Sequence, residues 1–135
     1  MKRSFIFSFA AIFFLTGCDN TPPYVQNAKS DLTAAIVANI FDDPYFGCES
    51  LQEENNWYIG CFEKTSNPNP FLLFSVKEDE SKTNPPFIYR LQAINGKAKQ
   101  YANHTALKMF EINHEANNSI DIETIRKDFI EKYAK

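Results

Sequence analysis

The first eighteen residues limit what this chain can fold into, because they hold an apolar run that is set apart from the rest. Lys2 and Arg3 precede the apolar stretch at residues 5–15. As a helix this stretch would be about 16 Å long, whereas the hydrocarbon core of a bilayer is about 30 Å thick. A basic start, a short apolar core and small residues after it are typical of a secretory signal peptide. We therefore expect residues 1–17 to be removed, which leaves 118 of the 135 residues to fold.

The end of this segment carries a more specific motif. Leu15-Thr16-Gly17-Cys18 resembles the lipobox of bacterial lipoproteins, and the resemblance covers only this N-terminal segment. It implies cleavage between Gly17 and Cys18, a diacylglyceryl group on the Cys18 sulfur and an acyl chain on the new amine. Two or more acyl chains hold a protein stably at a membrane. The alternative is an ordinary secretory signal that happens to precede a cysteine.

The residues after Cys18 indicate in which membrane we expect the protein to be anchored. Asp19 and Asn20 resemble the signal that keeps enterobacterial lipoproteins in the inner membrane, so we favour the inner membrane, facing the periplasm, with the outer membrane as the alternative. Residues 18–24 are expected to form a lipidated tether. We expect Pro22 and Pro23 to stiffen it and to exclude helix there. The single folded domain is then residues 25–135.

Charge and composition narrow the class of partner. Without Lys2 and Arg3, 12 basic residues remain against 17 acidic ones, a net charge of −5. Binding to nucleic acid requires clustered positive charge, so nucleic acid is not expected as a partner. Aromatic residues make up 15% of the chain, which favours a packed domain over a disordered tail.

The cysteines predict one covalent cross-link. With Cys18 carrying lipid, Cys48 and Cys61 remain as a pair in an oxidising compartment, and we predict a disulfide between them. The closed loop has 14 residues, for which the chain-entropy estimate is about 3 kcal/mol. A free thiol pair or a redox site is the alternative, although the spacing differs from that of a C-x-x-C motif.

Periodicity predicts the secondary structure. Apolar residues on one face predict a helix over residues 25–41, ended by Asp42-Asp43-Pro44. A loop at 45–56 is expected before strands at 57–62, 71–76 and 87–94, with a turn at 66–70 and an exposed loop at 77–86. The strand at 71–76 is apolar on both faces and is expected to be central.

The C-terminal third has a less regular apolar pattern. Asn95-Gly96 suits a hairpin, but residues 97–105 suit a short helix better than a strand, and we favour the helix. A fourth strand is predicted at 106–112. A last helix, capped by Ser119 or Asp121, follows. The fold class predicted is α+β, a small antiparallel sheet of three or four strands flanked by an N-terminal and a C-terminal helix, with one disulfide.

The sequence contains no recognisable metal-binding or catalytic motif. His104 and His114 are ten residues apart and lack the spacing that places two metal ligands on one helical face, so no metal site is predicted. No nucleophile motif is present, and the clustered carboxylates lie in polar segments, where carboxylates are usually solvated. We therefore predict no catalytic residues, no enzyme activity and no cofactor beyond the covalent lipid.

An interaction surface is the remaining candidate. Tyr45, Phe46, Trp57 and Tyr58, with Phe62, surround the predicted disulfide, and aromatic side chains make good binding anchors. The alternative is that they pack in the core. The function predicted is that of a lipid-anchored accessory module that binds another envelope protein, in the manner of assembly factors or of exclusion and immunity lipoproteins. The alternative is a small envelope enzyme or small-ligand binder.

Overall fold

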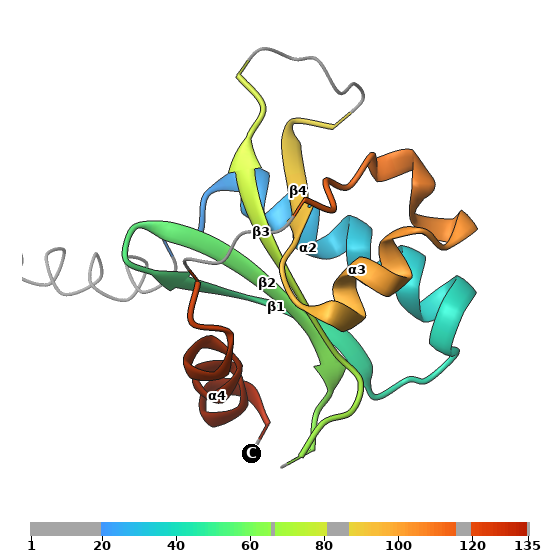
Figure 1. The fold of residues 1–135 in the computed structure, drawn as a ribbon, viewed down its shortest axis with the longest axis vertical. Coiled ribbons are helices and arrows are strands. Elements are labelled where there is room, and N and C mark those ends of the chain that lie inside the picture. Colours follow the sequence, from blue (N-terminus) through green and yellow to red (C-terminus); the bar gives the residue numbers. More distant parts are fainter. Residues whose placement is uncertain (1–19, 66, 81–86, 116–119, 135) are drawn as a thin grey trace, which may run out of the picture.

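The computed structural model describes residues 20–65, 67–80, 87–115 and 120–134 (Figure 1). The four strands form one antiparallel sheet in the order β1-β2-β3-β4. The α+β class with helices before and after the sheet is confirmed. The elements in chain order are α2 (Pro23–Ile36), the π-helical segment η2 (Val37–Phe41), β1 (Phe46–Glu53), β2 (Asn56–Glu63), β3 (Phe71–Glu78), β4 (Tyr89–Ala93), α3 (Gly96–Ala102), the 3₁₀ helix η3 (Thr105–Phe110) and α4 (Ile122–Tyr133).

The sheet separates two hydrophobic clusters. Helices α2 and α3 cover one face together with η3, and α4 lies on the other (Figure 1). In strand β3, Leu72 and Phe74 pack in the first cluster, on the side of α2, and Phe71 and Leu73 pack in the second cluster, on the side of α4. Because β3 lies between β2 and β4, the prediction that residues 71–76 form a central strand is confirmed.

The first helix has the predicted apolar stripe but starts earlier than predicted. It begins at Pro23, so the expectation that the two prolines exclude helix was wrong. The first helical position has no intrahelical partner for its N–H, so a proline is tolerated there. The chain leaves the helix at Asp42, which has a left-handed φ of 51°. The fully buried or nearly buried residues are Val25, Ala28, Leu32, Ala35 and Ile36.

The expected loop at 45–56 is instead mostly strand β1, which is the main correction to the predicted fold. Inward positions Phe46, Cys48 and Ser50 alternate with more exposed ones, as a strand on the edge of a sheet requires. Glu54 and Asn55 connect β1 to β2, and both have positive φ, 50° and 69°. Two such residues match the type I′ turn that suits the twist of a tight hairpin.

The predicted fourth strand at 106–112 was also wrong. Residues 105–110 form η3, which buries Leu107 and Phe110 on one side. The chain then passes beside β4, where the Ala93 N–H donates to the Asn113 carbonyl at 2.8 Å and the Asn113 N–H donates to the Leu91 carbonyl at 3.0 Å. This single parallel bridge closes the outer edge of β4.

The short helix at 97–103 and the last helix are confirmed. The Asn95 Oδ1 accepts from the Ala98 N–H at 3.0 Å and caps α3, while Asp121 caps α4. Ser119, the other predicted cap, lies outside the described residues, as does part of the predicted loop at 77–86. Within that loop Asp79 is only 5% exposed, so it was wrong to expect it in solvent.

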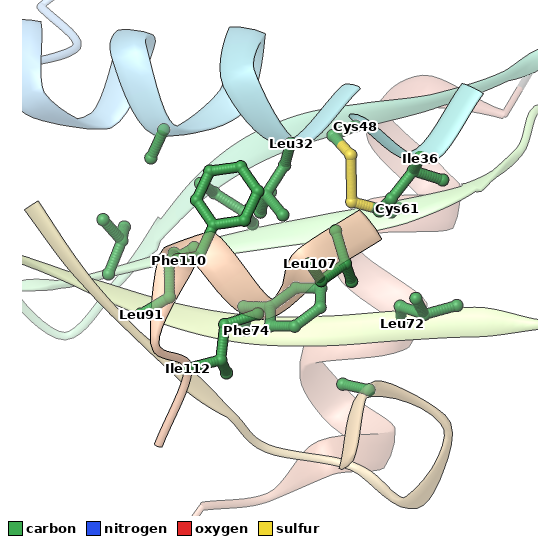
Figure 2. Close-up of a cluster of buried hydrophobic side chains, with 14 of the residues drawn as sticks. Leu32, Ile36, Cys48, Cys61, Leu72, Phe74, Leu91, Leu107, Phe110 and Ile112 are labelled. Atoms are coloured by element: carbon green, nitrogen blue, oxygen red, sulfur yellow. A yellow bond between two sulfur atoms is a disulfide. The ribbon is translucent and has the colours of Figure 1, made fainter. Parts of the chain in front are cut away.

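The disulfide between Cys48 and Cys61 is confirmed. The two residues are directly opposite each other in β1 and β2, with their Cα atoms 4.0 Å apart. The bond therefore joins two paired strands, whereas a link from a loop to a strand was expected. It lies in the first cluster beside Leu32 and Ile36 of α2 (Figure 2).

Candidate functional site

A groove of about 700 Å³ lies between the start of α2, strand β1 and the end of α4. We call it the N-terminal groove and define it by Asn20, Thr21, Lys29, Trp57, Lys132 and Tyr133, which all line it. Thr21 is fixed in place because the Gln26 side chain donates to its carbonyl at 2.9 Å. The chain therefore enters the fold at the groove.

The outer edge of β1 forms one side of the groove, and side chains from both flanking helices bond to it. The Cys48 N–H donates to the Thr33 hydroxyl of α2 at 3.2 Å. The Tyr133 hydroxyl of α4 donates to the Ser50 carbonyl at 2.6 Å. These hydrogen bonds hold both helices against the strand and occupy backbone groups that point outward from the sheet.

The charges in the groove are unevenly paired. The Glu49 carboxylate lies 3.0 Å from the Lys64 ammonium and 3.9 Å from that of Lys29, so two cations share one anion. Lys132 lies 5.2 Å from the ring centre of Tyr133, and no carboxylate among the described residues pairs with it. The end of α4 therefore brings to the groove a positive charge that forms no ion pair with a described residue.

The aromatic residues predicted to form one interaction surface do not meet. Tyr45 is 71% exposed, whereas Phe46 is buried and stacks on Phe41 with ring centres 4.3 Å apart. Trp57 is half-buried and lines the groove, while Tyr58 is buried in the second cluster on the other face. Successive residues of a strand point to opposite faces, which separates Trp57 from Tyr58.

The polar groups with shifted pKa values have structural explanations. Burial and a hydrogen bond to Asp31 raise the pKa of Tyr89, whose hydroxyl donates to the Asp31 carboxylate at 2.7 Å. A hydrogen bond with Asp128 raises the pKa of Glu53. His104 accepts from the Ala106 N–H through Nδ1 at 3.0 Å and so caps η3.

Among the described residues, no group of three or more His, Cys, Asp or Glu side chains could hold a metal ion. Within the same ranges no helix is both long and apolar enough to cross a bilayer. Gly17, Cys18 and Asp19, predicted as cleavage, lipidation and sorting residues, lie outside the described part of the chain, and Asn20 is exposed at its start.

Lys29, Lys132 and Tyr133 were missed by reasoning from the sequence. They come from the two ends of the described chain and meet only across β1, so no spacing in the sequence signals the groove. Comparison with protein family models, with curated proteins and with solved structures found no match to this chain.

Proposed function

We propose that this protein is a bacterial lipoprotein held at the membrane by acylated Cys18, with a folded domain that binds another protein of the cell envelope. The observation that carries the proposal is how soon the fold begins. Helix α2 starts at Pro23, and Val25 is already fully buried. Pro22 follows Cys18 by four positions, a span of at most about 14 Å. An acyl group on Cys18 would therefore keep the domain at the bilayer surface.

The disulfide supports an extracytoplasmic compartment. Cys48 is 6% exposed and Cys61 is fully buried, and they are bonded inside the first cluster. Structural disulfides persist in oxidising compartments and are rare in the cytosol of most organisms. We place the domain in the periplasm, at the inner membrane if Asp19 and Asn20 act as the enterobacterial retention signal.

Binding is favoured over catalysis because the polar groups with shifted pKa values are engaged in the fold. Tyr89 serves the packing of β4 against α2, since its hydroxyl bonds Asp31.

Tyr45 is the most exposed large hydrophobic residue among those described. Aromatic residues are enriched among those that dominate binding energy at protein interfaces. Tyr45 precedes the groove-lining residues Glu49 to Gln52 by four to seven positions, which is about 13–23 Å along the strand.

The anchor is tested with Cys18→Ser. We expect the native protein to carry the mass of acyl chains and to sediment with membranes, and the variant to accumulate as the uncut precursor. A native protein without acyl mass, or a variant that is processed and retained normally, would contradict the anchor.

The binding role is tested in intact cells with a photo-crosslinking amino acid at position 45. Position 109 is the control, because Met109 is also exposed, at 59%, and lies on η3. We expect a discrete protein adduct from position 45 that is absent from position 109 and is lost in Cys18→Ser. Equal adducts at both positions, or none from position 45, would contradict a partner at this end.

The alternative is a small-ligand binder that uses the N-terminal groove. The groove volume of about 700 Å³ falls within the range of known ligand pockets, about 300–1,000 Å³. Release of a defined small molecule from the purified native protein on denaturation, detected by mass spectrometry, would favour this alternative.

A further inference from the structure

We infer that the N-terminal groove faces the bilayer and receives the phosphate of a phospholipid headgroup beside Lys132. This inference rests on the proposed acyl anchor and adds to it an orientation and a ligand class. It also assigns different roles to the two ends of β1, with lipid at the groove and the protein partner near Tyr45.

Distance along the chain places the groove at the headgroups. Asn20 and Thr21 both line the groove. Thr21 follows Cys18 by three positions, so their Cα atoms can be at most about 11 Å apart. The headgroup layers add about 10–15 Å to the thickness of the hydrocarbon core. Since these layers divide between two leaflets, about 5–8 Å on each side, a tether that is short of full extension places Thr21 at the level of the headgroups.

The side chains in the groove suit a headgroup. Lys132 is exposed and has no carboxylate partner among the described residues, so its ammonium can meet a phosphate. Lys29 is a second cation, and its 3.9 Å distance from Glu49 is long for an ion pair. Trp57 and Tyr133 supply aromatic rings with polar tips, the side chains that are enriched at membrane interfaces.

An extended peptide suits the same groove less well. A peptide that added to the sheet would need the outward backbone groups of β1. The Cys48 N–H and the Ser50 carbonyl already bond to Thr33 and Tyr133. Strand addition at this edge would first have to break those hydrogen bonds and displace α4.

The net charge of the domain limits which lipids matter. Glu53 and Glu54 lie at the tip of the β1–β2 hairpin, next to the groove-lining residues. The chain without residues 1–17 is also acidic overall. Long-range attraction to an anionic surface is therefore not expected to drive binding. The phosphate of a zwitterionic headgroup should suffice, because the acyl chains supply the attachment.

Trp57 makes the inference directly measurable, because it is the only tryptophan in the chain. The acylated native protein is reconstituted in phosphatidylcholine vesicles that carry a nitroxide either on the headgroup or deep in the acyl chain. We expect the headgroup nitroxide to quench Trp57 at least twofold more than the deep one. The same result is expected when a fifth of the lipid is replaced by phosphatidylglycerol.

Two controls separate the groove from general proximity to the membrane. In Trp57→Phe/Met109→Trp the reporter moves to η3, which lies across the molecule from the β1–β2 hairpin tip (Figure 1), and quenching should fall at least twofold. Lys132→Glu should reduce quenching of Trp57 by about half, whereas Lys108→Glu on η3, the same charge change at another exposed lysine, should leave it unchanged.

The outcomes distinguish this inference from the proposed function. Protein that carries acyl mass and floats with the vesicles, but shows no more quenching at Trp57 than at position 109, would overturn the inference and leave the anchor standing. Protein that lacks acyl mass and does not float would overturn both. An adduct with a membrane protein from a crosslinker at position 52, together with an unquenched Trp57, would assign the groove to a protein instead.

Discussion

Gly60 of β2 packs against Phe129 of helix α4, and Gly60→Ala tests that packing. A Cβ atom at this position would lie 3.2 Å from Cδ1 and Cε1 of Phe129 and 3.2 Å from Cζ of Phe71. Carbon atoms in favourable contact are about 3.5–4.0 Å apart. Both rings are buried, with exposed fractions of 0% and 4%, so neither can move away into solvent.

The expected loss of stability in Gly60→Ala is the difference between two opposing effects. Adding a methylene-sized group to a packed core destabilises a protein by about 1–3 kcal/mol. Replacing glycine by alanine restricts the unfolded chain and contributes about 0.4–1 kcal/mol in the other direction. The net loss for Gly60→Ala should be about 1–2 kcal/mol. For a domain of this size that lowers the melting temperature by roughly 4–8 °C.

Gly47→Ala is the matched control on the neighbouring strand. The nearest atom to a Cβ there is the Lys64 Nζ at 3.7 Å, an ordinary contact. We expect this variant to melt at the native temperature or slightly above it, as measured by circular dichroism during heating and urea titration. In a Phe129→Leu background the cost of Gly60→Ala should shrink, because the two residues interact directly. An equal stability of the two alanine variants, or an undiminished cost of Gly60→Ala in the Phe129→Leu background, would refute the packing argument.

Three more predictions concern the sheet. Removing the disulfide with Cys48→Ala/Cys61→Ala should reduce the free energy of unfolding by about 3 kcal/mol and lower the melting temperature by roughly 10 °C without abolishing the fold. Native protein whose melting is unaffected by reductant would contradict this. Tyr89→Phe removes the donor to Asp31 and should cost about 1 kcal/mol in urea titrations, while an unchanged midpoint would show that the hydrogen bond adds nothing. A hydrogen bond with the Asp128 carboxyl group of α4 raises the pKa of Glu53 above 4.5. This contact therefore stabilises the fold at acid pH and is lost as the pH rises through the raised pKa. Glu53→Gln should therefore match the native protein at pH 4 and exceed its stability at pH 7 by less than about 0.5 kcal/mol, a small gain because solvent reaches the partly buried pair. A gain that did not depend on pH would contradict the assignment.

The helices could be predicted from the sequence because their signals are local. The apolar stripe of α2, the Asp121 cap of α4 and the Asn95 cap of α3 each lie within a few residues of the element that they define. Asn95 shows how a hairpin signal can mislead. Its side chain also accepts from the Leu73 N–H and donates to the Phe71 carbonyl, so it continues the bonding of β3 while it starts a helix.

Strand β1 could not be identified in the same way. The face of β1 toward α4 carries Gly47, Glu49, Leu51 and Glu53, a mixture that resembles a polar loop. What makes it a strand is pairing with β2, which the Cys48 disulfide reinforces and which no local pattern reports. The 3₁₀ helix η3 was mistaken for a strand because Leu107, Met109 and Phe110 are apolar. Met109 is exposed, however, and the buried Leu107 and Phe110 are three residues apart, a spacing that suits a 3₁₀ turn.

The groove depends on tertiary structure alone. Its residues come from the start of the described chain, from the β1–β2 hairpin and from the last turn of α4. The sequence did indicate that Trp57 was a candidate for binding, on its aromatic character. It could not show that Tyr45 and Trp57 would lie at opposite ends of the hairpin, because that follows from the strand that was missed.

The protection of the β1 edge leads to a last prediction. An edge strand with free backbone groups can pair with another chain, and natural proteins cover such edges. A protein confined to a membrane surface would meet other copies of itself often. The Tyr133 ring and hydroxyl cover Ser50, so Tyr133→Ala should expose this edge, whereas Tyr133→Phe keeps the ring and loses only the hydrogen bond.

We therefore expect the two variants to differ in association more than in stability. Loss of the hydrogen bond should cost each variant about 1 kcal/mol, and Tyr133→Ala somewhat more because packing is also lost. Only Tyr133→Ala should self-associate as its concentration rises, as measured by sedimentation of the detergent-solubilised acylated protein. If both variants stay folded and sediment as the native protein does at every concentration, covering by Tyr133 is not what protects the edge, and the Thr33 hydrogen bond to Cys48 on the same edge becomes the residue pair to test.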